Sequence, residues 1–357
     1  MVRGFWKRFV CGVINMTDYE KVYSFDNLYK AHLIARKGKR FKADVIHFEM
    51  NLAENLIKIQ EALENRTYQM QGYYNFYVYE PKKRLVDASY YPDRVLQHCL
   101  CDEVFGPLLQ KRLIYDNAAC QVGKGTHFAM RRLSQFIRQH YLCYGHTGYF
   151  LKCDVRKYFP TIDHQVLKQR LKHIVKDIDV CKLLFHLIGS YHTEGQPGKG
   201  LPLGNQTSQW FSLLYLDRLD RRIKEKHQVK HYIRYMDDLC LIHQDKHQLK
   251  EILQDITQFI EIEMKQTFNS KTQIFPIKNG IEFLGFRFSV KKNGKIIKRL
   301  RVATKNRYKR RISKLRQDYQ LGRITLSEVK NVLTSYRGHL KHGHTYQLQK
   351  RAMRRPF

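Results

Sequence analysis

The tetrapeptide Tyr235-Met236-Asp237-Asp238 (YMDD) interrupts an apolar segment that runs from Tyr232 to Ile242. Apolar residues on both sides of two adjacent carboxylates predict a β-hairpin whose turn carries Asp237 and Asp238. Neighbouring residues of a strand point to opposite faces, so both carboxylates reach one site only if the turn redirects them. We therefore expect Asp237 to make the more direct contribution to such a site.

A third acidic residue follows an earlier apolar segment. Tyr149, Phe150 and Leu151 lead towards Asp154, and Pro160 stops any strand or helix, which predicts a short buried strand that ends in a carboxylate. If this strand and the hairpin are neighbours in one sheet, their carboxylates converge. Two metal ions held in this way are what phosphoryl transfer from a nucleoside triphosphate requires. On spacing alone, two turn residues and a helix cap explain the same three aspartates equally well.

The charge of the chain indicates a polyanionic partner. Its 357 residues include 65 Lys and Arg against 32 Asp and Glu, a formal net charge of +33 that is spread along the whole sequence. Phosphate groups screen such self-repulsion and release counterions. A basic ribosomal or chromatin protein would share the charge, but a hydrophobic content of 43% predicts a substantial core. Nucleic acid or nucleotide binding is therefore expected, in one multi-lobed enzyme or two to three subdomains.

The cysteines and the hydropathy of the sequence indicate where in the cell the protein is expected. The eight cysteines are scattered, without a CxxC pair, and the N-terminus has no secretory apolar region. These features predict reduced thiols in a cytoplasmic protein. No run approaches the roughly 18 apolar residues that cross a bilayer, so no membrane insertion is expected.

Hydrophobic periodicity outlines the remaining elements. Residues Met50–Leu63 have helical spacing, and Tyr73–Tyr79 alternate like a strand. Asp245 is a candidate N-cap for a helix whose apolar face reaches Met264 and should cover the sheet of the hairpin. Beyond Phe288 the chain is strongly basic and then helical, which predicts a C-terminal helical lobe on nucleic acid. We expect the late histidines to contact RNA or a partner protein: His339, His342 and His344.

The YMDD tetrapeptide and five further blocks, in the same order, resemble the reverse transcriptases. The blocks are Tyr91–Gln97 (YPDRVLQ), Ala119–Thr126 (ACQVGKGT), Lys152–Pro160 (KCDVRKYFP), Leu201–Gln209 (LPLGNQTSQ) and Phe283–Phe288 (FLGFRF). The resemblance covers roughly residues 20–350 and implies an α+β fold, the right-hand polymerase. It implies fingers in 1–145, a palm in 146–290 with part of the fingers interleaved, and a thumb in 291–357.

This resemblance implies an RNA-directed DNA polymerase that uses dNTPs, an RNA template and an RNA–DNA duplex. Its catalytic residues would be Asp154, Asp237 and Asp238. These residues and Val155 would hold two Mg²⁺ ions, for which Mn²⁺ could substitute. The primer grip would be Phe283, Leu284 and Gly285, although FLGF also fits a plain strand with a bulge.

The resemblance also implies residues around the nucleotide and template. Phe159, five residues after Asp154, would exclude a 2′-hydroxyl, unless it is only a core aromatic before Pro160. The other nucleotide-binding positions are Lys83, Arg84, Leu203, Gly204, Gln209 and Lys271, and the RNA or template positions are Arg94 and Lys124. Since the chain is so basic, any single cation is equally explained as a solvated or backbone-binding charge.

One block narrows the resemblance. Most relatives have QG and SP where this chain has Leu203-Gly204 and Ser208-Gln209. LGNQTSQ is similar to the block of diversity-generating retroelement reverse transcriptases, as are Gly123–Thr126 and Tyr336–Tyr346. This predicts error-prone copying of a template repeat, with a structured noncoding RNA and a small basic accessory protein as partners. The alternatives are a defence or retron-like enzyme that copies a dedicated noncoding RNA, and a noncatalytic RNA-binding scaffold, which clustered carboxylates disfavour.

Overall fold

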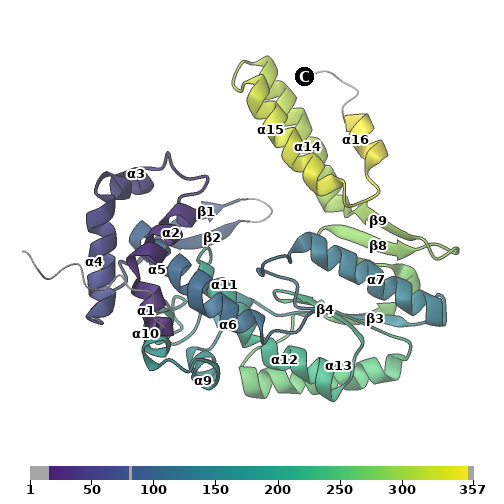
Figure 1. Cartoon of the computed structure of the whole chain (residues 1–357). Helices are drawn as coiled ribbons and strands as arrows, with labels where there is room; N and C mark the ends of the chain where they lie inside the picture. Colours follow the sequence, from purple (N-terminus) through teal and green to yellow (C-terminus); the bar gives the residue numbers. More distant parts are fainter. Residues whose placement is uncertain (1–15, 80–82, 353–357) are drawn as a thin grey trace, which may run out of the picture. The chain divides into compact units, whose positions relative to one another are not determined.

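The computed structural model describes residues 16–79 and 83–352. The chain divides into two compact units that alternate along the sequence (Figure 1). The first unit comprises Met1–Leu113 and Lys157–Tyr215, and the second comprises Ile114–Arg156 and Leu216–Phe357. Helices and antiparallel strands make up both units, which confirms the α+β class. The fingers, palm and thumb boundaries stay predictions.

The first unit is mainly helical. Its helices are α1 (Asp18–Tyr23), α2 (Phe25–Ala35), α3 (Ala43–Met50), α4 (Leu52–Glu64), α5 (Tyr91–Leu100), the π-helix η1 (Cys101–Phe105), α6 (Gly106–Gln110), α8 (Tyr158–Thr161), α9 (His164–Ile174), α10 (Ile178–Gly189) and α11 (Gln206–Tyr215). The helix expected over Met50–Leu63 begins later than predicted, because Asn51 has non-helical dihedrals (φ −126°, ψ 47°) between α3 and α4. Asn55 Nδ2 spans this break by donating to the carbonyl oxygen of Phe48 at 3.0 Å.

The first unit also contains an antiparallel hairpin, β1 (Tyr73–Val78) and β2 (Arg84–Ser89). Its register runs from Tyr73 opposite Ser89 to Val78 opposite Arg84, so the expected strand in this region is confirmed. The Lys83 ammonium lies 4.3 Å from the centre of the Tyr77 ring, a cation–π contact beside the end of the hairpin. Arg84 is therefore presented at the start of a paired strand.

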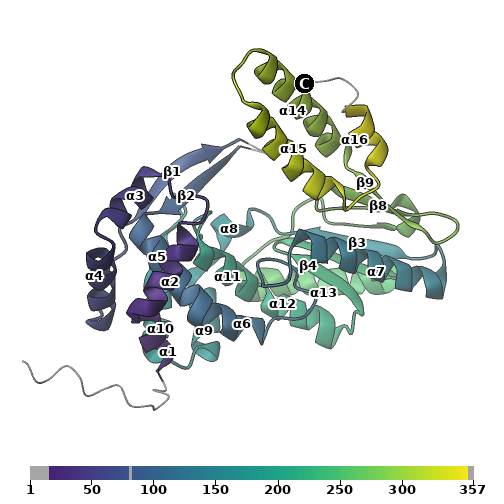
Figure 2. The ribbon, with the colours of Figure 1, turned by 45° about the horizontal axis from the view of Figure 1, so that its top comes forward.

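The second unit contains a four-stranded antiparallel sheet in the order β4-β5-β3-β6. The strands are β3 (Tyr149–Asp154), β4 (His231–Tyr235), β5 (Asp238–His243) and β6 (Gln273–Pro276). One face packs against α7 (Thr126–Tyr144) through a core that includes Phe136, Phe150 and Ile233. Figures 1 and 2 show α7 lying along this sheet. The expected hairpin and the strand that ends at Asp154 are both confirmed.

A long helix, α13 (Lys246–Met264), contacts β3, β5 and β6. The side chain of Asp245 accepts from the backbone N–H of His247 at 2.7 Å, so the predicted cap is confirmed. The buried positions of α13 follow the predicted apolar face: Leu249, Ile252, Ile256, Phe259, Ile260 and Met264. Two shorter helical segments directly precede β4, namely α12 (Asp217–Arg221) and the π-helix η2 (Arg222–Lys226).

A three-stranded sheet, a short 3₁₀-helix and three α-helices complete the second unit. They are the short 3₁₀-helix η3 (Ile277–Asn279), β7 (Ile281–Phe283), β8 (Phe286–Val290), β9 (Ile296–Leu300), α14 (Val302–Gln320), α15 (Leu326–Leu340) and α16 (Tyr346–Ala352). The FLGF segment is a hairpin turn between β7 and β8, and not a strand with a bulge. Leu284 (φ 48°) and Gly285 (φ 84°) both have positive φ, which is what a tight two-residue turn between antiparallel strands requires.

The late histidines contact the chain itself, and their expected contact with RNA or a partner protein stays a prediction. The ring of His342 stacks on that of His127 with 3.5 Å between centres, and His339 lies 5.1 Å from Phe286. His344 exchanges hydrogen bonds with the backbone of Lys298 at 2.7 and 3.1 Å.

Among the described residues, no helix is both long enough and apolar enough to cross a bilayer.

Candidate active site

Three carboxylates lie at one end of the four-stranded sheet. Asp154 is the last residue of β3, and Asp238, the first residue of β5, stands directly opposite it in the antiparallel register. Asp237 lies in the turn just before β5, and its carbonyl oxygen accepts from the backbone N–H of Val155 at 3.3 Å. The structure thus brings together the predicted carboxylates. Asp238 is the residue opposite Asp154, and the more direct contribution expected of Asp237 stays a prediction.

The turn that carries these carboxylates has a sparsely populated backbone conformation. Met236 has φ 55°, in the left-handed region that non-glycine residues rarely adopt. Its carbonyl oxygen accepts a hydrogen bond from Arg234 Nη1 at 2.9 Å. Such a conformation persists when surrounding contacts determine it. The contacts of Arg234 are therefore central to the geometry of the turn.

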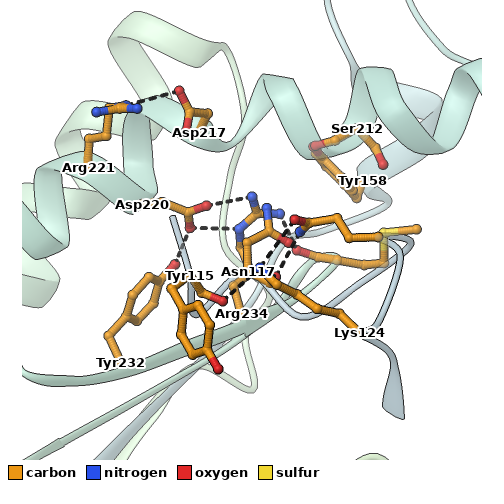
Figure 3. A network of polar contacts seen from close by, with 12 residues as sticks. Tyr115, Asn117, Lys124, Tyr158, Ser212, Asp217, Asp220, Arg221, Tyr232 and Arg234 are labelled. Atoms are coloured by element: carbon orange, nitrogen blue, oxygen red, sulfur yellow. Dashed lines mark hydrogen bonds and ion pairs between the residues drawn. The ribbon is translucent and has the colours of Figure 1, made fainter. Parts of the chain in front are cut away.

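Arg234 forms a buried ion pair beneath the turn (Figure 3). Its Nε and Nη2 atoms donate to the two carboxylate oxygens of Asp220 at 2.7 and 2.6 Å, and both side chains have 0% exposure. Tyr232 donates its hydroxyl to the same carboxylate at 2.5 Å. The backbone of Arg234 accepts from Ala118 at 2.9 Å and donates to Asp116 at 3.1 Å. Side-chain and backbone contacts together fix the strand that enters the turn.

Burial and charge alter the protonation of Asp238. Burial raises its pKa to about 7; Lys152 opposes this rise, while the carboxylates of Asp154 and Asp237 add to it. Lys152 Nζ lies 3.4 Å from Asp238 Oδ2. Asp238 Oδ1 is buried and lacks a hydrogen-bond partner among the described residues. One oxygen of this carboxylate is thus oriented by a cation and the other remains available to a ligand.

Asn269 holds the other carboxylate. Its Nδ2 atom donates to Asp154 Oδ2 at 3.2 Å and its backbone N–H donates to the carbonyl oxygen of Asp154 at 2.6 Å. Asn269 Oδ1 in turn accepts from the backbone N–H of Lys271 at 3.1 Å, an Asx turn that presents this lysine. Lys271, Asp154 and Asp238 line one hollow of about 580 Å³. The structure therefore brings the predicted Lys271 to the carboxylates.

The donor chemistry of these residues fits a hard divalent cation. Carboxylate and carbonyl oxygens are the ligands that Mg²⁺ takes in proteins. Asp238, whose buried Oδ1 lacks a partner among the described residues, is the cross-strand neighbour of Asp154. Within residues 16–79 and 83–352, no three His, Cys, Asp or Glu side chains are grouped closely enough to hold a metal ion. The metal role of Asp154, Val155, Asp237 and Asp238 therefore stays a prediction.

Several predicted nucleotide-binding residues lie together in the first unit. The carbonyl oxygen of Phe159 accepts from the backbone N–H of Leu201 at 3.0 Å, which joins α8 to the LPLG block. Asn205 Oδ1 accepts from the backbone and hydroxyl of Ser89 at 3.2 and 2.8 Å, which joins this block to β2. Gly204 has φ 111°, and a Cβ atom there would lie 2.9 Å from Val86 Cγ1. The strand of Arg84 is thus packed against the block that contains Leu203.

The predicted nucleotide-binding residues of the first unit differ in how far their side chains are exposed to solvent. Leu203 and Phe159 are half-buried, whereas Gly204, Gln209 and Arg84 are exposed. Leu203 is therefore not simply a core residue, and Gln209 on α11 is accessible.

The two cations expected to contact template are occupied by the chain itself. Arg94 Nε donates to the carbonyl oxygen of Ser89 at 2.8 Å and the guanidinium pairs with Asp44 at 3.1 Å. Lys124 Nζ donates to the carbonyl oxygens of Tyr115 and Asn117 at 2.8 and 3.1 Å (Figure 3), and burial lowers the pKa of this lysine. Through these contacts both side chains stabilise the fold, and their binding to template stays a prediction.

Sequence reasoning missed the partners of the carboxylates. Arg234, Asp220, Lys152 and Asn269 were not among the expected site residues. A signal existed for two of them, because Arg234 and Lys152 are basic residues inside otherwise apolar strands. Such a residue needs a buried acidic partner. No comparable signal marks Asp220 or Asn269.

Comparisons with known proteins place these residues in a family. The family model described as "Reverse transcriptase (RNA-dependent DNA polymerase)" matches residues 109–288, half of the chain. A curated relative, the putative COX1/OXI3 intron 2 protein of Saccharomyces cerevisiae, is 22% identical over 50% of this chain. The chain spans only 28% of the length of that relative.

Solved structures of two telomerases are also similar. The Candida albicans telomerase, in complex with a TWJ fragment of telomeric RNA, is 12% identical and covers 63% of this chain and 45% of its own, with a TM-score of 0.48. The apo telomerase of Candida tropicalis, truncated from its C-terminal domain, is 15% identical and covers 70% and 60%, with a TM-score of 0.45.

Proposed function

The chain belongs to the reverse transcriptase family of RNA-dependent DNA polymerases, and on that premise we propose that it copies an RNA template into DNA from dNTPs. One observation carries this proposal. The YMDD turn places Asp237 and Asp238 beside Asp154, the last residue of the neighbouring strand, at one end of the sheet. Convergent carboxylates beside a phosphate backbone would only weaken a surface that merely binds nucleic acid.

The proposed metal ligands are the carboxylates of Asp154, Asp237 and Asp238 and the carbonyl oxygen of Val155. Two Mg²⁺ ions, or Mn²⁺ in their place, would supply activation of the attacking hydroxyl and neutralisation of the leaving pyrophosphate. Lys152 orients Asp238 and favours its ionised form, because its ammonium lies 3.4 Å from Oδ2. Asn269 orients Asp154 by donating to Oδ2.

Nucleotide binding is proposed for each of the following residues by its own surroundings. We assign Lys271 to the triphosphate, because it lines the same hollow as Asp154 and Asp238. Arg84 and Lys83 at the hairpin would contact phosphate oxygens, for which guanidinium groups suit well. Phe159 would exclude a 2′-hydroxyl and so select dNTPs. The primer end would meet the turn at Phe283, Leu284 and Gly285.

A diversity-generating retroelement is the proposed biological setting. The support is the sequence LGNQTSQ, in which apolar Leu203 stands where most relatives carry a glutamine. Loss of that polar group would remove a constraint on the incoming base, which suits error-prone copying of a template repeat. A structured noncoding RNA and a small basic accessory protein would then be the partners. A defence or retron-like enzyme is the alternative, and accurate copying would favour it.

Primer extension on RNA and DNA templates, with dNTPs or NTPs, tests both the proposed activity and the proposed error-prone copying. We expect metal-dependent DNA synthesis from RNA, with errors concentrated at template adenines in the sequenced products. Asp237→Asn should abolish synthesis and leave RNA binding intact. Glu251→Gln, at an exposed carboxylate on α13, is the matched control and should extend like the wild type. Wild-type synthesis by Asp237→Asn would refute the site, and no synthesis by the wild-type protein would favour a binding scaffold.

A further inference from the structure

A basic groove lies on the second unit, between α7 and the turn that joins β8 to β9. Its volume is about 540 Å³, and we refer to it as the α7 groove. Four cationic side chains line it: Arg131 and Arg138 from α7, and Lys295 and Lys298 from the turn and β9. The other lining residues are polar, apolar or glycine, and no acidic residue is among those that line it. The groove therefore has a single sign of charge.

The α7 side of the groove is one face of the helix. Arg131, Gln135, Arg138 and Leu142 follow each other at spacings of three or four residues, which places them in a row. Arg131 and Arg138 are exposed and form no ion pair with any residue of the described chain. Their neighbour Arg132 differs, because its Nε atom pairs with Asp116 at 2.6 Å. Two of these three cations are thus uncommitted.

The opposite side is a turn that is fastened to the helix. Within the turn, the N–H of Lys291 donates to the carbonyl oxygen of Lys295 at 3.0 Å. Tyr141 on α7 donates its hydroxyl to the carbonyl oxygen of Lys292 at 2.8 Å. Gly294 has φ 75°, and a Cβ atom there would lie 2.5 Å from the Tyr141 ring, so the turn packs closely on the tyrosine. The groove is therefore preformed.

The groove and the carboxylates occupy different places in the second unit. Tyr141 is in the last turn of α7, and α7 leads into the first residue of β3, Tyr149. Asp154 stands five residues further on, at the other end of that strand, about 16 Å away along its length. The lining residues of the groove include none of those that line the hollow beside Asp154 and Asp238.

We propose that the α7 groove binds the phosphodiester backbone of an RNA segment outside the primer–template duplex. Arg131 and Arg138 are seven residues apart, about 10 Å along the helix. Two guanidinium groups at this spacing can contact separate phosphates of one strand. Ser134, Gln135 and Asn293 supply polar groups for phosphate oxygens and ribose hydroxyls. This inference rests on the proposed function only in taking RNA as the substrate.

The double variant Arg131→Gln/Arg138→Gln tests the groove. The probe is a labelled RNA hairpin with a blocked 3′ end, whose dissociation constant is measured over a range of salt concentrations. The slope of log K against log salt should fall by about 1.4 to 1.8, since each phosphate contact contributes about 0.7 to 0.9. Lys230→Gln/Lys250→Gln removes the same charge at two exposed sites outside the groove, and should leave the slope unchanged.

Three further measurements test whether the effect comes from the groove itself, rather than from net charge or from catalysis, and which part of RNA is recognised. Tyr141→Phe removes the hydrogen bond to Lys292 without changing the charge, and should also weaken hairpin binding. Extension of a short primer–template should keep its kcat and KM in the Arg131→Gln/Arg138→Gln variant. A DNA hairpin of the same sequence distinguishes the sources: weaker binding of both hairpins supports recognition of phosphate alone, and weaker binding of RNA only supports added contacts with 2′-hydroxyls.

Three results would overturn this assignment. The first is a salt slope for Arg131→Gln/Arg138→Gln equal to that of the wild type. The second is loss of extension on the short primer–template, which would make the groove part of the catalytic duplex path. The third is reduced binding of polyglutamate by the variant with unchanged RNA binding, which would assign the groove to an acidic protein.

Discussion

Replacing Arg234 by methionine should strongly destabilise the second unit. The substitution leaves the Asp220 carboxylate at 0% exposure with its two guanidinium hydrogen bonds removed and only the Tyr232 hydroxyl, at 2.5 Å, among the donors shown in Figure 3. Loss of one partner from a buried ion pair costs about 3 to 5 kcal/mol. Since domains are stable by about 5 to 15 kcal/mol, this is a large share of the total.

Urea denaturation of the wild type and four variants measures the effect. Arg234→Met and Asp220→Leu should each lower the free energy of unfolding by several kcal/mol, whereas Arg234→Met/Asp220→Leu should lower it by less than the sum of the two single changes. Arg218→Gln removes an exposed pair with Glu263 and should change it by less than about 1 kcal/mol. An Arg234→Met protein within about 1 kcal/mol of the wild type would refute the reasoning.

Three further predictions concern Lys152 beside Asp238, His342 beside His127, and Asn205 beside Ser89. Lys152→Met removes the cation that lowers the pKa of Asp238, so the pH profile of DNA synthesis should move to higher pH; an unmoved profile would contradict the pairing. Burial is the main cause that lowers the pKa of His342, and the charge of His127 is the second. The imidazole of His342 therefore binds a proton more readily in the unfolded chain than in the folded one. The melting temperature should decrease as the pH falls below about 6.5. His342→Gln should reduce that dependence, and an identical dependence would exclude this histidine. Asn205→Ala should cost about 1 to 3 kcal/mol in urea denaturation by leaving the Ser89 donors unpaired, while Asn27→Ala, at a half-buried contact, should cost less.

The hairpin that carries the YMDD turn could be predicted because its signal is local. Apolar residues on both sides of the turn, with carboxylates at its tip, require only neighbouring positions of the chain. The same is true of α13, where one cap residue and a helical repeat of apolar residues gave the start and the buried face. The pairing of Asp154 with Asp238 was only a condition of the hypothesis, because strand order depends on the whole sheet.

Other features depend on contacts that the sequence does not display. Asp220 meets Arg234 across fourteen positions, and Asn269 meets Asp154 across 115. The FLGF segment was ambiguous because a leucine at φ 48° departs from the usual preference for glycine or asparagine in such turns. The helix break at Asn51 was missed because the apolar repeat continues across it.

The buried Arg234–Asp220 pair bears on how the YMDD turn stays ordered. Packing alone would favour replacing such a pair by apolar side chains, since a buried ion pair is weak evidence of stability. An apolar residue at position 234, however, would leave the carbonyl oxygen of Met236 without the donor that lies 2.9 Å away. That carbonyl precedes Asp237, and Met236 is in an unfavourable backbone region. The pair is therefore best explained as a device that holds this peptide plane, and with it the orientation of the carboxylates, against the mutual repulsion of the acidic groups.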